Sequence, residues 1–115
     1  KKIILQPMRN QAKLREYLFT IGYQIIDEDV AMEAKKFYEI IVAKRANLKR
    51  FDEIDILVGP VLRYKRISVV YEYINHRIRI LQKVIESLKN TNSRAGKIAL
   101  LECERQIKAL KEAIK

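Results

Sequence analysis

The sequence contains one cysteine, one histidine and no tryptophan among its 115 residues. A lone cysteine, Cys103, excludes an intramolecular disulfide, which fits a reducing cytoplasm. One cysteine and one histidine, His76, cannot complete the four-ligand set of a closed zinc site. We therefore expect neither a disulfide framework nor a metal site in this chain.

Glycine is also scarce, and Gly22, Gly59 and Gly96 are each isolated. Loops that cradle phosphates or dinucleotides need clustered glycines, so we expect no such loop here. No apolar run approaches the roughly 18–20 residues that a membrane span needs. The sequence begins with Lys1 rather than methionine, and we expect it to be a piece of a longer protein.

Positive charge is abundant and unevenly distributed. The formal net charge is +10, of which residues 61–115 carry +8 and residues 1–60 only +2. A local basic excess favours a polyanionic partner such as nucleic acid, and less strongly an anionic membrane surface. The alternative is a lysine-rich helical surface that serves only solubility.

The first element is a short apolar run, Ile3–Leu5, which Gln6 and Pro7 end. This pattern predicts a buried strand, and a buried strand needs neighbours on both sides. Only two lysines precede it, so we expect its other partners to come from a missing part of the protein. Asn10 is then a candidate N-cap for a helix that ends at Gly22.

Two further strands are predicted, Tyr23–Met32 and Phe37–Lys44, joined by a turn over Glu33–Lys36 into an antiparallel hairpin. In the second strand the wholly apolar alternate positions predict the core face; they are Tyr38, Ile40 and Val42. The acidic run Asp27–Asp29 alternates sides along the first strand, so we expect it at a solvated edge.

Residues 45–67 form a mixed connector around the apolar patch Ile56–Leu62, which the pair Gly59-Pro60 interrupts. Three acidic residues of this connector are expected to be solvated; they are Asp52, Glu53 and Asp55. We place a boundary here, between an N-terminal part over residues 1–62 and a basic helical part over residues 63–115.

From Ser68, a candidate N-cap, apolar residues recur at alternating spacings of three and four. The first seam consists of Tyr71, Ile74, Ile78, Leu81, Ile85 and Leu88, and the second of Leu100, Cys103, Ile107, Leu110 and Ile114. Two such helices around the polar breaker Asn90–Gly96 predict an antiparallel hairpin packed as a coiled coil. Cys103 is expected to be a small buried hydrophobe, and His76 an exposed flank residue.

The predicted fold class is therefore α+β: a strand, a helix and an antiparallel β-hairpin, as in the last part of a Rossmann-like sheet, followed by the helical hairpin. In open α/β sheets, ligands bind beyond the carboxyl ends of strands, where Gln6 lies. Its amide offers both a donor and an acceptor to a base edge. The alternative is a plain turn that ends the strand and requires only Pro7.

Five segments, taken together, resemble the C-terminal half of the bacterial tRNA adenine(22)-N1 methyltransferase family. They are IILQP at Ile3–Pro7, LREYL at Leu14–Leu18, GYQIIDED at Gly22–Asp29, FYEIIVAKR at Phe37–Arg45 and VGPVL at Val58–Leu62. The sequence departs from the expected pattern at Met8, where the family has Asn, at Tyr17, where it has Trp, and at Val58, where it has an aromatic residue.

The resemblance implies a parent enzyme that uses S-adenosylmethionine to methylate N1 of a tRNA adenine. The methyl donor would bind the missing N-terminal half, so we expect no cofactor and no activity in this chain alone. Gln6 and Pro7 would lie on the substrate side, and no catalytic residue is assigned. The expected tRNA-binding residues are Arg63, Lys65, Arg66, Arg77, Arg79 and Lys83, with weaker candidates in Lys97, Arg105, Lys108 and Lys111.

A second interpretation is a non-enzymatic coiled-coil module that mediates interaction or dimerisation. Homodimers are expected either through the exposed sheet edge or through the coiled-coil seam. Tyr64, between two of the basic residues, could stack on a base or be buried against the hairpin.

Overall fold

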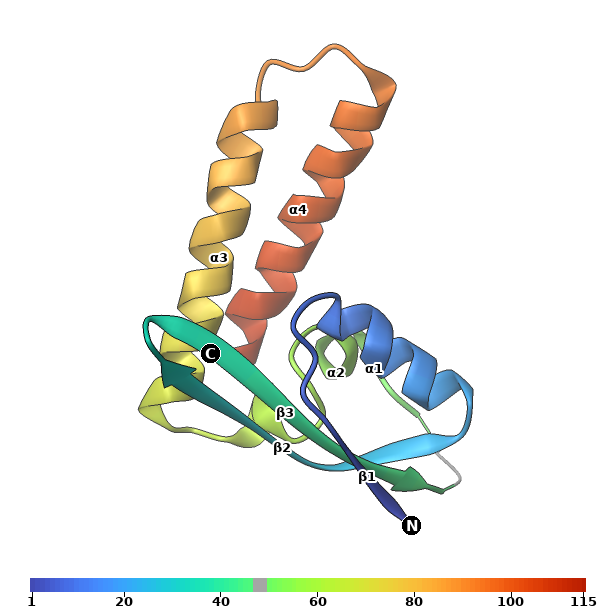
Figure 1. Cartoon of the computed structure of the whole chain (residues 1–115). Coiled ribbons are helices and arrows are strands. Elements are labelled where there is room, and N and C mark those ends of the chain that lie inside the picture. Colours follow the sequence, from blue (N-terminus) through green and yellow to red (C-terminus); the bar gives the residue numbers. More distant parts are fainter. Residues whose placement is uncertain (47–49) are drawn as a thin grey trace.

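A computed structural model describes residues 1–46 and 50–115, which form a small sheet, short helices and a long helical hairpin (Figure 1). The elements in chain order are β1 (Lys2–Leu5), α1 (Gln11–Thr20), β2 (Tyr23–Glu33), β3 (Lys36–Arg45), α2 (Glu53–Leu57), a 3-10 turn (Leu62–Tyr64), α3 (Ser68–Leu88) and α4 (Arg94–Ala113). None of the helices in these ranges combines the length and apolar character that crossing a bilayer requires.

The sheet has three antiparallel strands in the order β1-β3-β2, which confirms the predicted strand, helix and hairpin. The hairpin turns at Ala34 and Lys35, whose φ angles of 51° and 65° are both positive. Two consecutive positive φ angles are the geometry of a tight type I′ turn, which suits the twist of the flanking strands. The Glu33–Lys36 pair closes the ladder at the hairpin tip.

A β-bulge in β2 decides which side chains face the helices. The pairing moves from Ile25 opposite Ala43 to Asp27 opposite Val42, so Ile26 is an extra residue. Because one extra residue reverses the alternation, Glu28 lies on the same face as Ile25. The prediction of a solvated acidic run is therefore wrong at Glu28, which is 1% exposed, although its two acidic neighbours are exposed.

The core face of β3 is also opposite to the one expected. Instead of Tyr38, Ile40 and Val42, the buried positions are Glu39, Ile41 and Ala43. Ile40 is 36% exposed. The apolar pattern misled here because Glu39 is accommodated inside by polar partners from two helices, so a charged residue occupies an interior position.

Helix α1 covers this inner face. Its N-terminus follows Asn10, but Asn10 has a left-handed conformation and makes no side-chain capping bond, so the predicted cap is wrong. Its C-terminus is as predicted: Gly22 follows with φ +87° and donates its N–H to the Phe19 carbonyl at 3.3 Å. Leu18 and Phe19 pack with Ile25 and strand residues into one of two core clusters.

The predicted connector contains a helix that the sequence pattern did not reveal; residues 47–49 of it lie outside the described residues. In α2, the side chain of Asp52 accepts from the Asp55 backbone N–H, and Asp55 accepts from that of Asp52. This capping box stabilises the first turn, so these residues are not merely solvated charge. A five-residue helix is too short to show an apolar period.

Helices α3 and α4 form the predicted antiparallel pair, which projects from the sheet as a stalk (Figure 1). Every predicted seam residue is buried or half-buried, and Cys103 is buried as expected. Coiled-coil packing of the seam remains a prediction. The helix ends differ slightly: Ile67, not Ser68, is the N-cap of α3, and α4 begins at Arg94, inside the predicted breaker.

The base of the stalk shares a hydrophobic core with the sheet and α2. This cluster joins Val30 of β2 and Leu57 of α2 to Ile74 of α3 and Leu110 of α4. His76, expected to be exposed, is half-buried, with its ring centroid 5.2 Å from that of Phe37. The stalk is thus seated on the β-hairpin by apolar packing.

Substitution of Gly59 by alanine should destabilise the fold more than the same substitution at Gly22. Both have positive φ, +123° and +87°, but only a Cβ at Gly59 would overlap the Glu28 carboxylate, whereas Gly22 has open space. We expect a loss of about 1 kcal/mol for Gly22→Ala from backbone strain, and about 3 kcal/mol or more for Gly59→Ala. Urea unfolding of both variants measures the difference, and equal losses would contradict the close approach to Glu28.

Candidate functional site

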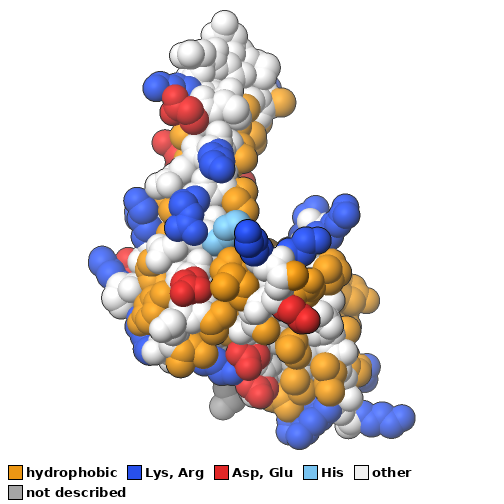
Figure 2. Space-filling view, turned by 60° about the vertical axis from the view of Figure 1, so that its left-hand side comes forward, with side chains coloured by type: hydrophobic (Ala, Val, Ile, Leu, Met, Phe, Trp, Pro, Cys, Tyr) orange, Lys and Arg blue, Asp and Glu red, His pale blue; other side chains and the backbone are white. Residues whose placement is uncertain are grey.

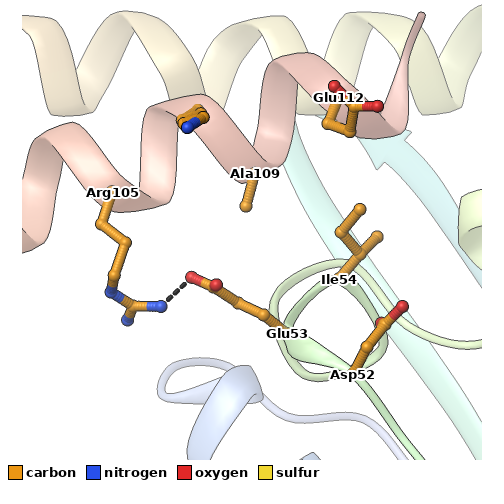
Figure 3. Close-up of a pocket in the computed structure, with 7 residues that line it drawn as sticks. Asp52, Glu53, Ile54, Arg105, Ala109 and Glu112 are labelled. Carbon is orange, nitrogen blue, oxygen red and sulfur yellow. Dashed lines mark ion pairs between the residues drawn. The ribbon is translucent and has the colours of Figure 1, made fainter.

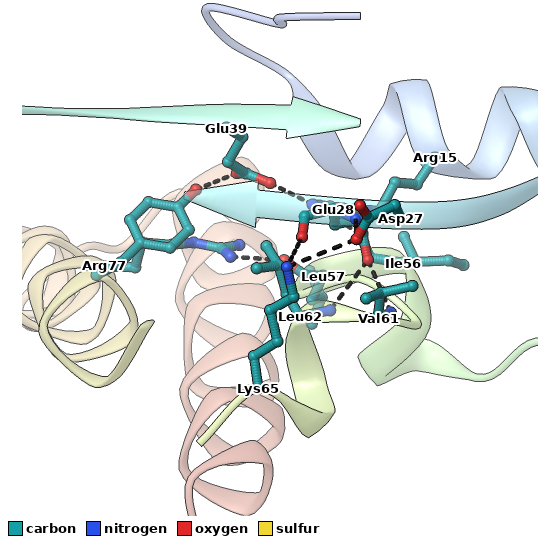
Figure 4. Close-up of polar contacts among 11 residues, drawn as sticks. Arg15, Asp27, Glu28, Glu39, Ile56, Leu57, Val61, Leu62, Lys65 and Arg77 are labelled. Atoms are coloured by element: carbon teal, nitrogen blue, oxygen red, sulfur yellow. Dashed lines mark hydrogen bonds and ion pairs between the residues drawn. The ribbon is translucent and has the colours of Figure 1, made fainter. Parts of the chain in front are cut away.

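A buried ionic cluster lies between α1 and the two long strands (Figure 4). Arg15 of α1 is 0% exposed, and its Nε donates to Glu28 Oε2 at 2.9 Å. Its Nη2 donates to the carboxylate of Glu39, and the Nη1 reaches the Ile56 carbonyl at 3.5 Å. One guanidinium therefore bridges two carboxylates on neighbouring strands, which is the planar fork geometry that arginine provides.

The two carboxylates extend the cluster to the segments that follow. Glu28 Oε1 accepts the backbone N–H groups of Val61 and Leu62 at 2.8 and 3.2 Å. The Tyr73 hydroxyl of α3 donates to Glu39. No side-chain polar atom buried in the described part of the chain lacks a hydrogen-bond partner. The cluster thus fixes the turn after α2 and the base of the stalk relative to the sheet.

Burial and pairing act in opposite directions on these groups. Burial raises the pKa of Glu28, while Arg15 and the two backbone donors lower it less strongly. For Arg15, burial opposes the charge, but the carboxylates of Glu39 and Glu28 outweigh it and raise the pKa of the guanidinium. Burial, followed by the charge of Glu39, raises the pKa of Tyr73, which keeps its hydroxyl a donor.

The end of β1 lies on the side of the molecule where the stalk begins. Leu5 pairs with Ile41, and the chain continues toward the hairpin tip. Gln6 is exposed and Pro7 half-buried, so the amide predicted to meet a base is accessible. Met8, 69% exposed, lines a pocket with residues of the tip and of α3.

Four of the predicted RNA-binding residues are engaged in contacts within the fold. Arg63 pairs with Asp52 at 2.7 Å and with Asp55 at 2.8 Å. Its hydrogen bond lowers the pKa of Asp52, and the two carboxylates together outweigh burial and raise that of Arg63. The other contacts join Lys65 to the Glu28 carbonyl, Arg66 to the Lys115 carbonyl at 3.2 Å, and Arg77 to the Leu57 carbonyl at 2.6 Å.

The remaining two, Arg79 and Lys83, are exposed on α3 and make no ion pair or hydrogen bond with any described residue. They are four residues apart, so they lie on one face of the helix. Among the weaker candidates, Arg105 pairs with Glu53 and Glu102. Lys97, Lys108 and Lys111 are exposed.

Two pockets beside the stalk differ in charge. One, of about 430 Å³, lies between α2 and α4 and is lined by Asp52, Glu53 and Glu112, with Arg105 directed at Glu53 (Figure 3). The other, of about 480 Å³, lies between the hairpin tip and α3, and we call it the junction pocket. Figure 2 shows the only histidine at this junction of stalk and body, with basic side chains around it.

The junction pocket is lined by residues that the sequence did not single out. Lys35 and Lys36 come from the hairpin tip, Phe37 from the start of β3, and Arg77 from α3. Their separation along the chain hides their proximity, and no spacing rule could have joined them. Nowhere in the described residues do three or more His, Cys, Asp or Glu side chains gather as they would to hold a metal ion.

A mixed α/β half-sheet with a helical stalk defines the class of this protein, and comparison with known proteins defines the family. The family tRNA (adenine(22)-N(1))-methyltransferase, TrmK, matches residues 1–112. The chain belongs to the TrmK family, as the resemblance predicted.

Relatives in this family are about twice as long as the chain. The tRNA (adenine(22)-N(1))-methyltransferase of Bacillus subtilis strain 168 is 28% identical over 120 residues, which cover 99% of this chain and 50% of the relative. The crystal structure of the B. subtilis M1A22 tRNA methyltransferase TrmK gives a TM-score of 0.86 at 26% identity, covering 100% and 52% of the two chains.

A Streptococcus pneumoniae relative adds a ligand to the comparison. Sp1610, described as a putative tRNA (m1A22) methyltransferase and solved in complex with S-adenosyl-L-methionine, has a TM-score of 0.82 at 27% identity. It is covered over 48% of its length by the whole of this chain. The chain therefore spans about half the length of the relatives it matches.

Replacement of Arg15 by methionine should strongly destabilise the fold. The variant would keep the apolar length of the side chain but leave Glu28 and Glu39 buried without their shared cation. Removing one member of a buried ion pair costs about 3–5 kcal/mol. Lys13→Met on the exposed side of the same helix is the matched control, and we expect a change within about 0.5 kcal/mol. Urea denaturation compares them; similar stability of the two variants would contradict the role of the cluster.

The cost of Arg15→Met should depend on pH. The pKa of Glu28 is already raised in the fold, and loss of Arg15 removes an interaction that lowers it. A carboxyl with a raised folded pKa stabilises the fold below its unfolded pKa of about 4.3 and loses that contribution as the pH rises. The difference in unfolding free energy between variant and unaltered protein should therefore be smaller near pH 5 than at pH 8. A constant difference would contradict this.

Proposed function

We propose that the chain is the tRNA-docking half of an S-adenosylmethionine-dependent tRNA adenine-N1 methyltransferase. The observation that carries the proposal is the family match over residues 1–112, in a chain that spans half the length of its relatives. In this proposal residues 1–62 complete a Rossmann-like catalytic domain, and residues 63–115 form a basic coiled coil for tRNA.

The residues of this chain do not fit a binding loop for the methyl donor. Gly22 follows a helix end, Gly59 faces the Glu28 carboxylate, and Gly96 lies within α4, so none forms a glycine-rich strand-to-helix turn. S-adenosylmethionine, bound by the other half, supplies the methyl group, and we assign no step of the transfer to this chain.

The contribution of this chain to the reaction would be positioning. N1 lies on the Watson–Crick edge of adenine, so the base must be unpaired before it can react. Gln6 is exposed at the end of β1 and carries the donor and acceptor that could orient that edge. Pro7 would fix the direction in which the chain leaves the strand.

The stalk would supply affinity. RNA is held largely through phosphates and shape, and cations that are not already paired suit this purpose. Arg79 and Lys83 meet that condition, whereas Arg63 is held by two carboxylates. The exposed cations of α3 are therefore the first contacts to test.

The function is tested by titrating the chain with unmodified bacterial tRNA across a salt series, with calorimetry for S-adenosylmethionine in parallel. We expect tRNA binding that weakens steeply with salt and no heat from the methyl donor. No binding of tRNA at low salt would overturn the docking role. Binding of the donor would overturn the assignment of the donor site to the other half.

Arg79→Ala with Lys83→Ala should weaken tRNA binding and reduce its dependence on salt. Each lost phosphate contact lowers the slope of log affinity against log salt by about 0.7–0.9, so the double variant should lose about 1.5. Arg63→Ala is the comparison: it should lower the thermal midpoint by breaking its pairs with Asp52 and Asp55, with little change in slope. A double variant with an unchanged slope would contradict the proposed contacts.

A second candidate function, a dimerisation module, is favoured by apolar side chains exposed on the stalk. They are Ile80 and Val84 on α3, which are 49% and 38% exposed, and Ile98 and Leu101 on α4, which are 58% and 67% exposed. Sedimentation at several concentrations tests it. A dimer that resists salt and dissociates on Leu101→Lys would support the module, and a monomer throughout would exclude it.

A further inference from the structure

The junction pocket brings together the tip of the β-hairpin, the start of β3 and the lower part of α3. Its volume is about 480 Å³, within the range of roughly 300–1,000 Å³ typical of small-molecule sites. Figure 2 shows it where the stalk meets the body, beside the histidine. Neither the proposed function nor the family match assigns anything to it.

One wall of the pocket is aromatic. The ring centroid of Phe37 lies 5.3 Å from that of Tyr73 and 5.2 Å from that of His76. Tyr73 is buried with its hydroxyl on Glu39, but Phe37 and His76 are half-buried and line the pocket. Flat rings at a pocket wall are surfaces on which an unpaired base can stack.

The rim of the pocket is basic. Lys35 and Lys36 are exposed at the hairpin tip, and the guanidinium of Arg77 lies 5.4 Å from the centre of the Tyr73 ring. None of the residues lining this pocket is acidic, in contrast to the pocket between α2 and α4 with its three carboxylates. Neither tip lysine makes an ion pair with any described residue.

The backbone holds the two lysines in place. Lys35 has φ 65° and follows Ala34 at φ 51°, so both turn residues are in the compact type I′ conformation. Lys36 is already in the ladder, paired with Glu33. A turn of this kind presents two adjacent cations from a fixed backbone, which reduces the conformational entropy lost when they meet a ligand.

The pocket also adjoins the segment that leaves β1. Met8 and Gln11 line it, and Gln6 and Pro7 immediately precede them in the chain. The pocket therefore lies beside the segment where the proposed function places the substrate base.

We propose that the junction pocket binds one unpaired nucleotide of the RNA substrate, with its base on Phe37 and His76 and its phosphate on Lys35 and Lys36. The inference rests on the proposed function, since it takes the substrate to be tRNA. It adds a contact on the β-hairpin to those expected on the stalk.

The first test removes the charges. In the complete methyltransferase, Lys35→Asn with Lys36→Ala removes two cations; asparagine is chosen because it tolerates positive φ. Lys44→Ala with Arg45→Ala is the matched control, because it removes two adjacent exposed cations from the other end of β3. We expect the tip variant to bind unmodified tRNA roughly tenfold more weakly, with a salt slope lower by about 1.5, and the control to lose little of either.

The second test separates stacking from charge. His76→Ala should weaken tRNA binding by roughly tenfold with the salt slope unchanged, because stacking releases no counterions. His76→Phe keeps a ring and should restore most of the affinity. A structural role of this residue would instead lower the thermal midpoint of both variants without this split.

The outcomes distinguish the pocket from the function as a whole. Normal tRNA binding and slope in the tip variant, with the unaltered protein binding tRNA, would overturn the pocket and leave the proposed function intact. Equal losses in the tip variant and its control would likewise overturn it, because charge alone would then explain the effect. Failure of the unaltered protein to bind tRNA would overturn both proposals.

Discussion

A single buried guanidinium determines how the parts of this chain fit together. Arg15 joins α1 to both long strands, and its carboxylate partners continue to the turn after α2 and to α3. Buried charges are tolerated only when they are paired and hydrogen-bonded, so each partner depends on the others being in place. The sheet, the turn and the stalk are consequently not independent units, although the sequence pattern divides them near residue 62.

The regular elements were predictable, because they rest on local patterns. The strand before Pro7, the hairpin and both long helices follow from apolar spacing and from breakers such as Gly22. The facing of the hairpin was not, because a one-residue bulge at Ile26 reverses the alternation and leaves no trace in the sequence. The interior place of Glu39 was hidden for a similar reason, since its partners come from α1 and α3.

The candidate site shows the same division. Composition indicated a basic C-terminal half, but it could not tell a cation that binds the fold from one that is open to a ligand. Arg63 and Arg77 are held by carboxylates or a carbonyl, while Arg79 is exposed on the same stalk. The lysines of the hairpin tip lie in the less basic half and join α3 only through the tertiary fold.

The contact between the Tyr73 hydroxyl and Glu39 lies near the fixed end of a long lever. Helix α3 has 21 residues, and at a rise of about 1.5 Å per residue it extends about 30 Å. A tilt of about 10° at its base would carry the far loop through about 5 Å, by this helical geometry. A bond the size of one hydroxyl therefore sets the reach of the whole arm, and small repacking around it would change which part of a long, curved ligand the arm can touch.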